Sequence, residues 1–187
     1  MPGTQNIGDS VKNSIVGTIR GTGDIVNAVT ETVSGSLSTA LRGAGSVGQA
    51  LTGAVSDVAR GVIHGTKEVG GDLGAAAKGA VIGTLRGTKE VGGEALDAVG
   101  SSAENLVKTT AETGGDVAKV AKSAVEGAIA GAKDIGVNTA DAASAAATGA
   151  LKAAGDIGGA AVEQVKRAVT GVISGVNVVV KEPFRKS

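Results

Sequence analysis

Gly65-Thr66-Lys67-Glu68-Val69-Gly70-Gly71 recurs unchanged 22 residues later as Gly87-Thr88-Lys89-Glu90-Val91-Gly92-Gly93. Weaker copies of this heptapeptide continue at the same spacing in both directions, from Gly21 to Ala153. The spacing holds without insertion or deletion from about residue 10 to residue 174, so most of the chain repeats every 22 residues. Self-similarity at a fixed period indicates one periodic structure and not a mosaic of unrelated elements.

Large aliphatic residues occupy two positions of the repeat, six residues apart, and further apolar residues follow at steps of four. Steps of three and four predict helix and not strand. Twenty-two residues correspond to two 11-residue repeats, a period for which an apolar stripe winds right-handedly. We therefore predict an all-α chain of one long amphipathic helix, or of several helices, with a right-handed contact stripe. The predicted stripe consists of Ile19, Ile25, Leu41, Val47, Ile63, Val69, Leu85, Val91, Val107, Ile129, Ile135, Leu151, Ile157 and Ile173.

Charged residues also keep to fixed positions of the repeat. One position holds a cation in most copies, and the position four residues later holds an acid in most copies, as in Arg86 and Glu90. This spacing predicts ion pairs between successive turns of one helix. Lysine plus arginine and aspartate plus glutamate number 18 each, so the formal charge is zero. A neutral chain without runs of like charge lacks the electrostatic footprint of a nucleic-acid-binding protein.

The 32 glycines and the near absence of aromatic residues, at 1%, oppose a conventional core. Each glycine in a helix interior costs about 1 kcal/mol relative to alanine, so a lone helix of this sequence is not expected to be stable in water. Two interpretations are open. The glycines let packed helix backbones approach closely, with Gly70, Gly92, Gly114, Gly136 and Gly158 on the apolar side, or they keep the chain disordered until it is bound or assembled. Doublets such as Gly70-Gly71 also fit hairpin turns in a bundle.

No motif of the sequence indicates an enzyme. Gly43-Ala44-Gly45-Ser46-Val47-Gly48 matches the dinucleotide-binding pattern, but no apolar strand precedes it and it is one copy of the repeat. His64 occupies the cation position, which predicts a solvated surface residue. The carboxylates recur with the repeat, whereas catalytic residues are singular. We expect no catalytic, cofactor-binding or metal-binding residue, no cofactor and no small-molecule substrate.

Three segments are expected: a flexible N-terminal tail over residues 1–9, the helical repeats over residues 10–174, and a valine-rich C-terminal tail over residues 175–187. Pro183 ends any helix near residue 182. Phe184, the only aromatic residue, makes this tail either a docking peptide or a frayed end. Without a secretory signal or an apolar stretch long enough to span a bilayer, the expected location is cytoplasmic, with peripheral attachment to membranes or lipid bodies.

The repeat resembles the late embryogenesis abundant (LEA) proteins of the 11-residue type, and is similar to the lipid-surface helices of synucleins and perilipins. The residues that carry the resemblance are Thr66-Lys67-Glu68-Val69, Thr88-Lys89-Glu90-Val91 and the weaker copies at Thr110, Ala132 and Ala154. The resemblance implies disorder in dilute solution and an amphipathic helix on drying or on lipid. It also implies that there is no active site and no cofactor.

The function expected from residues and resemblance is non-enzymatic. The chain would fold as helix on membrane or lipid surfaces, or on destabilised proteins, as a stress protectant, with the stripe making the contact. The alternative is a self-assembling structural protein, in which several copies or one folded chain bury the stripe in a helical bundle, tube or filament. A spacer or scaffold that presents the C-terminal tail is a third interpretation. The expected partners are a lipid or membrane surface, or other copies of the chain, and not nucleic acid.

Overall fold

The computed structural model describes all residues except 1–6, 23, 44–46, 93 and 181–187, together with the backbone but not the side chains of residues 21, 22 and 47–49. Its elements are α1 (Ile7–Thr22), α2 (Ile25–Arg42), α3 (Val47–Glu68), α4 (Leu73–Glu90), α5 (Ala95–Glu112), α6 (Val117–Ile135), α7 (Thr139–Ile157), α8 (Gly159–Val169), β1 (Gly171–Ile173) and β2 (Val176–Val178). The prediction of a helical repeat chain is confirmed, but one long continuous helix is wrong. Helices α4, α5, α6 and α7 begin 22 residues apart, so in this part of the chain each repeat is one helix and its adjoining turn.

The turns form where a glycine with positive φ is followed by a polar cap. Gly70, Gly92, Gly114 and Gly136 all have φ between 69° and 76°, a region that favours glycine. The Gly70 amide donates to the Lys67 carbonyl and the Gly71 amide to the Thr66 carbonyl, which satisfies the last carbonyls of α3. The following helix then begins behind a side-chain cap, Asp72 for α4, Asp116 for α6 and Asn138 for α7. These glycines therefore end helices and do not pack them together.

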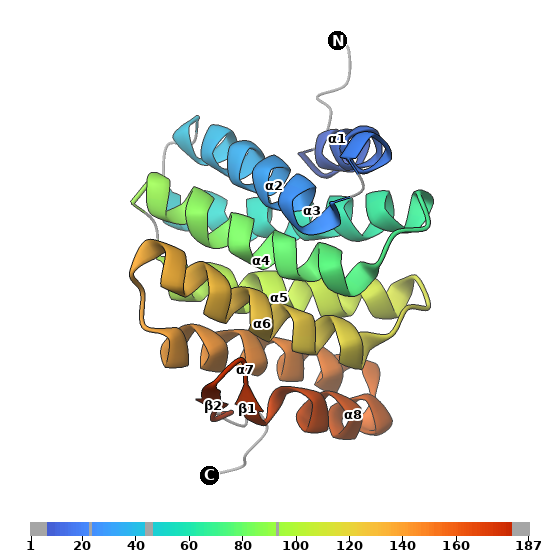
Figure 1. The fold of residues 1–187 in the computed structure, drawn as a ribbon, viewed down its shortest axis with the longest axis vertical. Coiled ribbons are helices and arrows are strands. Elements are labelled where there is room, and N and C mark those ends of the chain that lie inside the picture. Colours follow the sequence, from blue (N-terminus) through green and yellow to red (C-terminus); the bar gives the residue numbers. More distant parts are fainter. Residues whose placement is uncertain (1–6, 23, 44–46, 93, 181–187) are drawn as a thin grey trace.

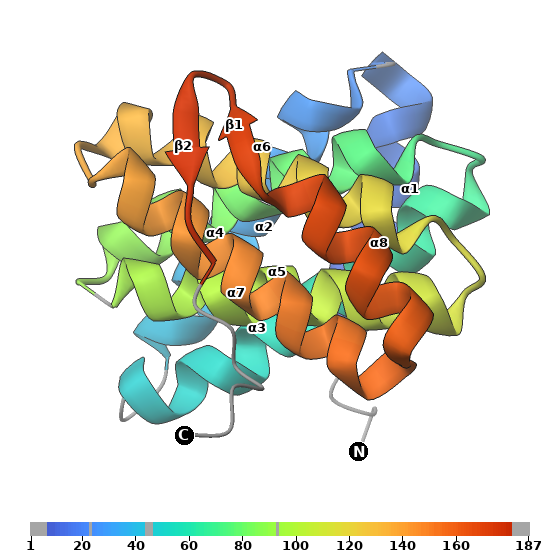
Figure 2. The same cartoon turned by 90° about the horizontal axis from the view of Figure 1, so that it is seen from below.

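The helices lie in two layers. The odd-numbered helices α1, α3, α5 and α7 form one layer and the even-numbered helices form the other, because α1 to α7 each pack chiefly against a helix two places away in the chain. Figure 1 shows the helices stacked along the long axis of the molecule, from α1 and α2 at one end to α8 and the hairpin at the other. Figure 2 views the stack from the hairpin end. The arrangement is a short helical solenoid.

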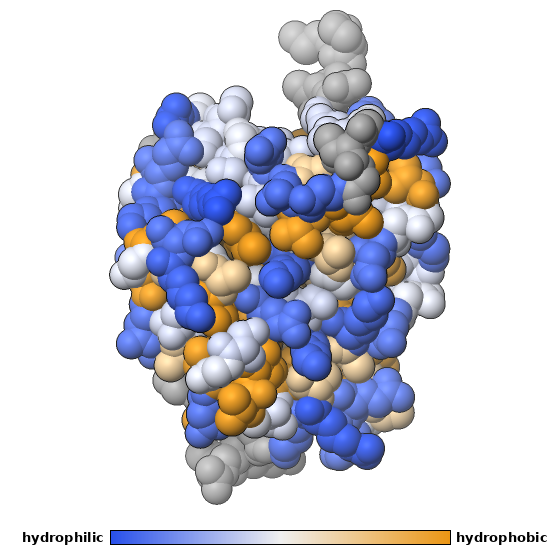
Figure 3. Space-filling model, viewed as in Figure 1, coloured by the Kyte–Doolittle hydropathy of each residue, from blue (hydrophilic) through white to orange (hydrophobic). Residues whose placement is uncertain are grey.

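The predicted contact stripe lies mostly inside the molecule. Its first set is buried between the layers at Leu41, Ile63, Leu85, Val107, Ile129 and Leu151, with Ile19 partly buried and Ile173 buried in β1. The second set lies near the turns, where Ile25, Val69, Val91 and Ile135 are partly buried and Ile157 is 42% exposed. The side chain of Val47 lies outside the described residues. Figure 3 shows hydrophilic side chains over much of one face, with smaller apolar areas between them.

Close contact between helices depends on a second set of glycines. A Cβ atom built on Gly83 of α4 would lie 2.6 Å from the Thr30 carbonyl oxygen of α2. Gly61, Gly127 and Gly149 occupy the same repeat position and likewise meet the backbone of the helix two places earlier. The close-approach interpretation is thus supported, but for this set and not for the turn glycines Gly70, Gly92, Gly114, Gly136 and Gly158, where an added Cβ atom would meet no other part of the chain within 4 Å.

Among the described residues, Arg42, Arg86 and Lys152 form ion pairs with other helices. Arg42 pairs with Glu90, Arg86 with Asp134 (2.7 Å), and Lys152 with Glu104 (3.3 Å), in each case linking helices two places apart. The predicted pairing of Arg86 with Glu90 in one helix is therefore corrected, since Arg86 binds Asp134 and Glu90 binds Arg42 and Ser38. Because the chain forms separate helices that run parallel within each layer, each of these cations lies beside an acid of another repeat.

The ends of the stack depart from the repeat. β1 and β2 form an antiparallel hairpin whose Ile173 and Val178 are buried against the last helices. The expected helical region, residues 10–174, therefore extends past α8, which ends at Val169, into this hairpin. At the other end α1 begins at Ile7, inside the expected tail of residues 1–9. Residues 1–6 of that tail, and residues 181–187 with Phe184, lie outside the described residues.

Candidate functional site

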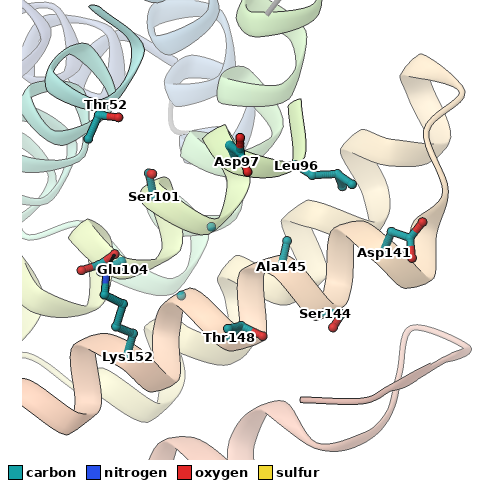
Figure 4. Close-up of a pocket in the computed structure, with 12 residues that line it drawn as sticks. Thr52, Leu96, Asp97, Ser101, Glu104, Asp141, Ser144, Ala145, Thr148 and Lys152 are labelled. Carbon is teal, nitrogen blue, oxygen red and sulfur yellow. Dashed lines mark hydrogen bonds and ion pairs between the residues drawn. The ribbon is translucent and has the colours of Figure 1, made fainter. Parts of the chain in front are cut away.

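A groove of about 630 Å³ runs over the odd-numbered layer. Helices α5 and α7 form its two sides, and α3 contributes Thr52 at its edge (Figure 4). The lining side chains include Leu96, Asp97, Ser101 and Glu104 from α5, and Asp141, Ser144, Ala145, Thr148 and Lys152 from α7.

Two glycines set the depth of the groove. A Cβ atom on Gly149 of α7 would collide with the carbonyl group of Gly100 in α5, so the two backbones touch at this crossing. Because neither residue has a side chain, nothing stands above the crossing, and the groove floor there is helix backbone. Small residues on either side, Ser101 and Ala145, leave the walls low. The glycines that allow packing of the layer thus also open its surface.

The groove carries more negative than positive charge. Its lining includes three carboxylates, those of Asp97, Glu104 and Asp141, and one ammonium group, that of Lys152. Lys152 Nζ lies 3.3 Å from Glu104 Oε2, so this cation is already paired. Asp97 and Asp141 are exposed, and Figure 4 shows them at the same end of the groove as Leu96. That end presents two carboxylates without a cation among the lining residues.

Leu96 is an apolar side chain that packing of the repeat does not require. It is 37% exposed, although it is one of the larger aliphatic residues. The same repeat position holds Gly74 in α4, Ala118 in α6 and Ala140 in α7. In α4 and α6 the large apolar residue comes one position earlier and is partly buried, whereas α5 has the smaller Ala95 there. The shift by one residue moves the leucine of α5 out of the core and onto the groove.

The residues singled out from the sequence do not form this site. The stripe residues lie in the core or at turns, and the groove contains none of them. The pattern at residues 43–48 follows helix α2 and not a strand, and its residues 44–46 lie outside the described residues. His64 is exposed, as expected, beside a smaller cavity of about 200 Å³ between α1 and α3, which Asp9, Lys12, Asp57 and Arg60 also line.

Sequence reasoning missed the groove because it looked for what the repeats share. The signal was in what one repeat does differently: the exchange of large and small residues at Ala95 and Leu96. Among the described residues, no group of three or more histidine, aspartate or glutamate side chains could hold a metal ion. None of the described helices combines the length and the apolar character needed to cross a bilayer.

Comparison with known proteins bears on the fold only. No known protein family and no curated protein matches the sequence. Among solved structures, the chain is similar to a de novo designed helical repeat protein, DHR7, with a TM-score of 0.52 and 20% sequence identity. The match covers 87% of this chain and 90% of the designed protein. This likeness is to a helical repeat fold, in agreement with the two layers of stacked helices.

Proposed function

We propose that this chain is a non-enzymatic helical-repeat scaffold that binds a segment of a partner protein in the groove of α3, α5 and α7. The observation that carries the proposal is the exposed Leu96 beside Asp97 and Asp141, at a repeat position where α4, α6 and α7 have glycine or alanine. Protein–protein interfaces commonly combine an apolar centre with a polar rim. A cytoplasmic location stays part of the proposal.

The buried stripe supports a folded scaffold over a surface-induced helix. Leu41, Ile63, Leu85 and Ile129 are at most 1% exposed, so the residues expected to contact lipid are occupied by contacts within the chain. An amphipathic helix that lies on a membrane instead presents its apolar face to the acyl boundary. In the folded chain, the surface left for a partner is made of groove side chains.

Attachment to lipid or to destabilised proteins is a second candidate function. The observation that favours it is the composition of the core, in which valine and alanine predominate and no aromatic side chain is buried among the described residues. Shallow contacts of this kind bury less apolar area per residue than aromatic ones. Separation of the helices would expose the stripe in a form suited to a lipid surface. This candidate requires opening of the molecule, which the groove proposal does not.

Selection from a displayed random peptide library on the immobilised chain tests the groove proposal. We expect enriched peptides to bind the unmodified protein, and to lose at least tenfold in affinity for Ala145→Arg, because the new side chain fills the groove. The matched control is Ala160→Arg, an equal change at an exposed position of α8. Peptides that bind both variants equally would contradict the proposal, as would a selection without any enriched peptide.

A further inference from the structure

The C-terminal strand brings the end of the chain to the groove. Ser144, which lines the groove on α7, donates a hydrogen bond of 2.7 Å from its Oγ to the Val179 carbonyl oxygen. Val180, the last described residue, packs partly buried against the core. The described part of the chain therefore ends beside the groove wall, seven residues before the end of the sequence. Attachment close to a binding site gives a short segment an effective concentration in the millimolar range.

The sequence of this segment complements the groove in charge. Lys181, Arg185 and Lys186 supply three cations against the single carboxylate of Glu182. The groove has the opposite excess, three carboxylates against Lys152, which is paired with Glu104. The segment also contains Phe184, the only aromatic residue of the chain, and the groove has an exposed leucine at its acidic end. Charge and apolar contact can thus be satisfied together.

Segment length is also sufficient. Seven extended residues span at most about 23 Å. The stretch of α7 from Asp141 to Lys152 covers eleven helical steps, which correspond to about 16 Å. Starting from Ser144, within this stretch, the segment can reach the acidic end of the groove at Asp97 and Asp141.

We propose that residues 181–187 bind in the groove between α5 and α7, with their basic side chains toward Asp97 and Asp141, and so compete with any partner segment. The inference rests on the groove of the proposed function, but it needs no partner. It makes the C-terminal segment an internal competitor. A partner would then have to displace it or bind when it is released.

Paramagnetic NMR tests this proposal on the full chain. The sequence contains no cysteine, so Ser187→Cys allows a single spin label at the last residue. We expect the label to broaden the amide signals of Leu96, Ala145 and Thr148 at least fivefold more than those of the even-numbered helices. Broadening spread evenly over the molecule, or concentrated on another face, would overturn the proposal.

Charge variants separate binding from mere proximity. Asp97→Asn combined with Asp141→Asn should restore the groove signals at least threefold, because the carboxylates that attract the segment are gone. The matched control combines Glu31→Gln with Glu163→Gln, two exposed positions in the even-numbered layer, and should leave the broadening unchanged. Equal broadening in both double variants would overturn the electrostatic part of the proposal and with it the assigned site.

A peptide added in trans distinguishes failure of this inference from failure of the proposed function. The probe is the heptapeptide Lys-Glu-Pro-Phe-Arg-Lys-Ser, added to the full chain carrying Lys181→Glu, Arg185→Glu and Lys186→Glu. Shifts of the groove signals with the probe, together with broadening in cis, support the inference. Groove shifts without broadening in cis overturn the inference and leave the groove proposal standing. If the probe shifts no groove signals and the label causes no broadening in cis, the inference is overturned, and the result also contradicts a peptide-binding groove.

Discussion

At the residue scale, the glycines of this chain perform two tasks that the sequence does not separate. Gly114 has φ +76° and open space around it, so its task is to turn the chain. Gly83 is helical and lies against the backbone of α2, so its task is close packing. At Gly114, a side chain would strain the backbone. At Gly83, a side chain would collide with the backbone of α2. For this reason Gly92→Leu or Gly114→Leu would strain a turn and would not report on helix packing.

Gly17 and Gly83 form a matched pair, because they share a repeat position but differ in surroundings. Nothing lies within 4 Å of a Cβ atom on Gly17, whereas one on Gly83 meets the Thr30 carbonyl oxygen at 2.6 Å. Gly17→Ala should therefore raise the free energy of unfolding by up to about 1 kcal/mol through helix propensity. Gly83→Ala should lower it by about 1–3 kcal/mol through overpacking. Urea unfolding measures both, and changes of the same sign would contradict the assigned packing.

Asp72 is predicted to stabilise the start of α4 in a pH-dependent manner. The hydrogen bond from Lys119, together with those from the Ala75 and Gly74 amides, lowers the pKa of the Asp72 carboxyl from its ordinary value of 3.8. Its contribution is therefore complete above pH 3.8 and is lost as the pH falls through the lower folded value. Asp72→Ala should cost about 1 kcal/mol at pH 7, as loss of a cap typically does.

The pH series provides the control for this prediction. Asp72→Asn keeps a capping oxygen and removes the charge, so it should cost less than Asp72→Ala at pH 7. The difference between the unmodified chain and Asp72→Asn should shrink as the pH is lowered below 3.8, because the carboxyl becomes neutral. Thermal unfolding from pH 7 to pH 2 measures this difference in stability. A difference that grows as the pH falls would contradict the prediction.

At the scale of elements, helices two places apart are the interacting units. Ion pairs join α2 to α4, α4 to α6 and α5 to α7 along the exposed surface. Lysines add a second link, since Lys67 donates to the Thr113 carbonyl and Lys89 to the Ile135 carbonyl, both at the ends of helices two places further along. Cations at helix C-termini interact favourably with the unsatisfied carbonyls there. The repeated charge pattern therefore aligns neighbouring helices in register.

Double-mutant cycles on Arg86 distinguish contacts between helices from contacts along one helix. The cycle with Asp134 should give a coupling energy of about 0.2–1 kcal/mol, the range for exposed pairs, and the coupling should weaken in high salt. The cycle with Glu90 should give a value near zero, because Glu90 binds Arg42 and Ser38 in the structure. A larger coupling to Glu90 than to Asp134 would restore the pairing expected from sequence spacing.

At the scale of the whole molecule, both ends of the solenoid are finished differently from its middle. In α1, Ser14 and Thr18 occupy the repeat positions that hold the buried Val58 and Val62 in α3. At the other end, the hairpin lies against α7 where a further helix of the odd-numbered layer would pack. Repeat proteins need terminal units of this kind because an interior repeat exposes apolar surface when it comes last.

The folded solenoid should be helical in buffer without any partner. Far-UV circular dichroism should show the full helical signal at micromolar concentration, and dilution should leave it unchanged because the stripe is buried within one chain. Neutral lipid vesicles should not increase the helix content. A coil in buffer that becomes helical on vesicles would contradict the fold and favour the surface-induced helix of LEA-like proteins. A signal that disappears on dilution would favour assembly between copies.

The sequence by itself determined that this protein is helical, that it repeats every 22 residues and that Leu41, Leu85 and Ile129 belong to one apolar stripe, because these properties follow from local periodicity. It could not determine whether the helix continued through Gly70 and Gly92, since a glycine within an apolar pattern fits a helix interior as well as a turn. Only the tertiary structure decided that Arg86 meets Asp134, because that contact depends on which helices become neighbours. The groove also depends on the tertiary structure, because Gly100, Gly149 and Leu96 come together only when α5 and α7 pack side by side.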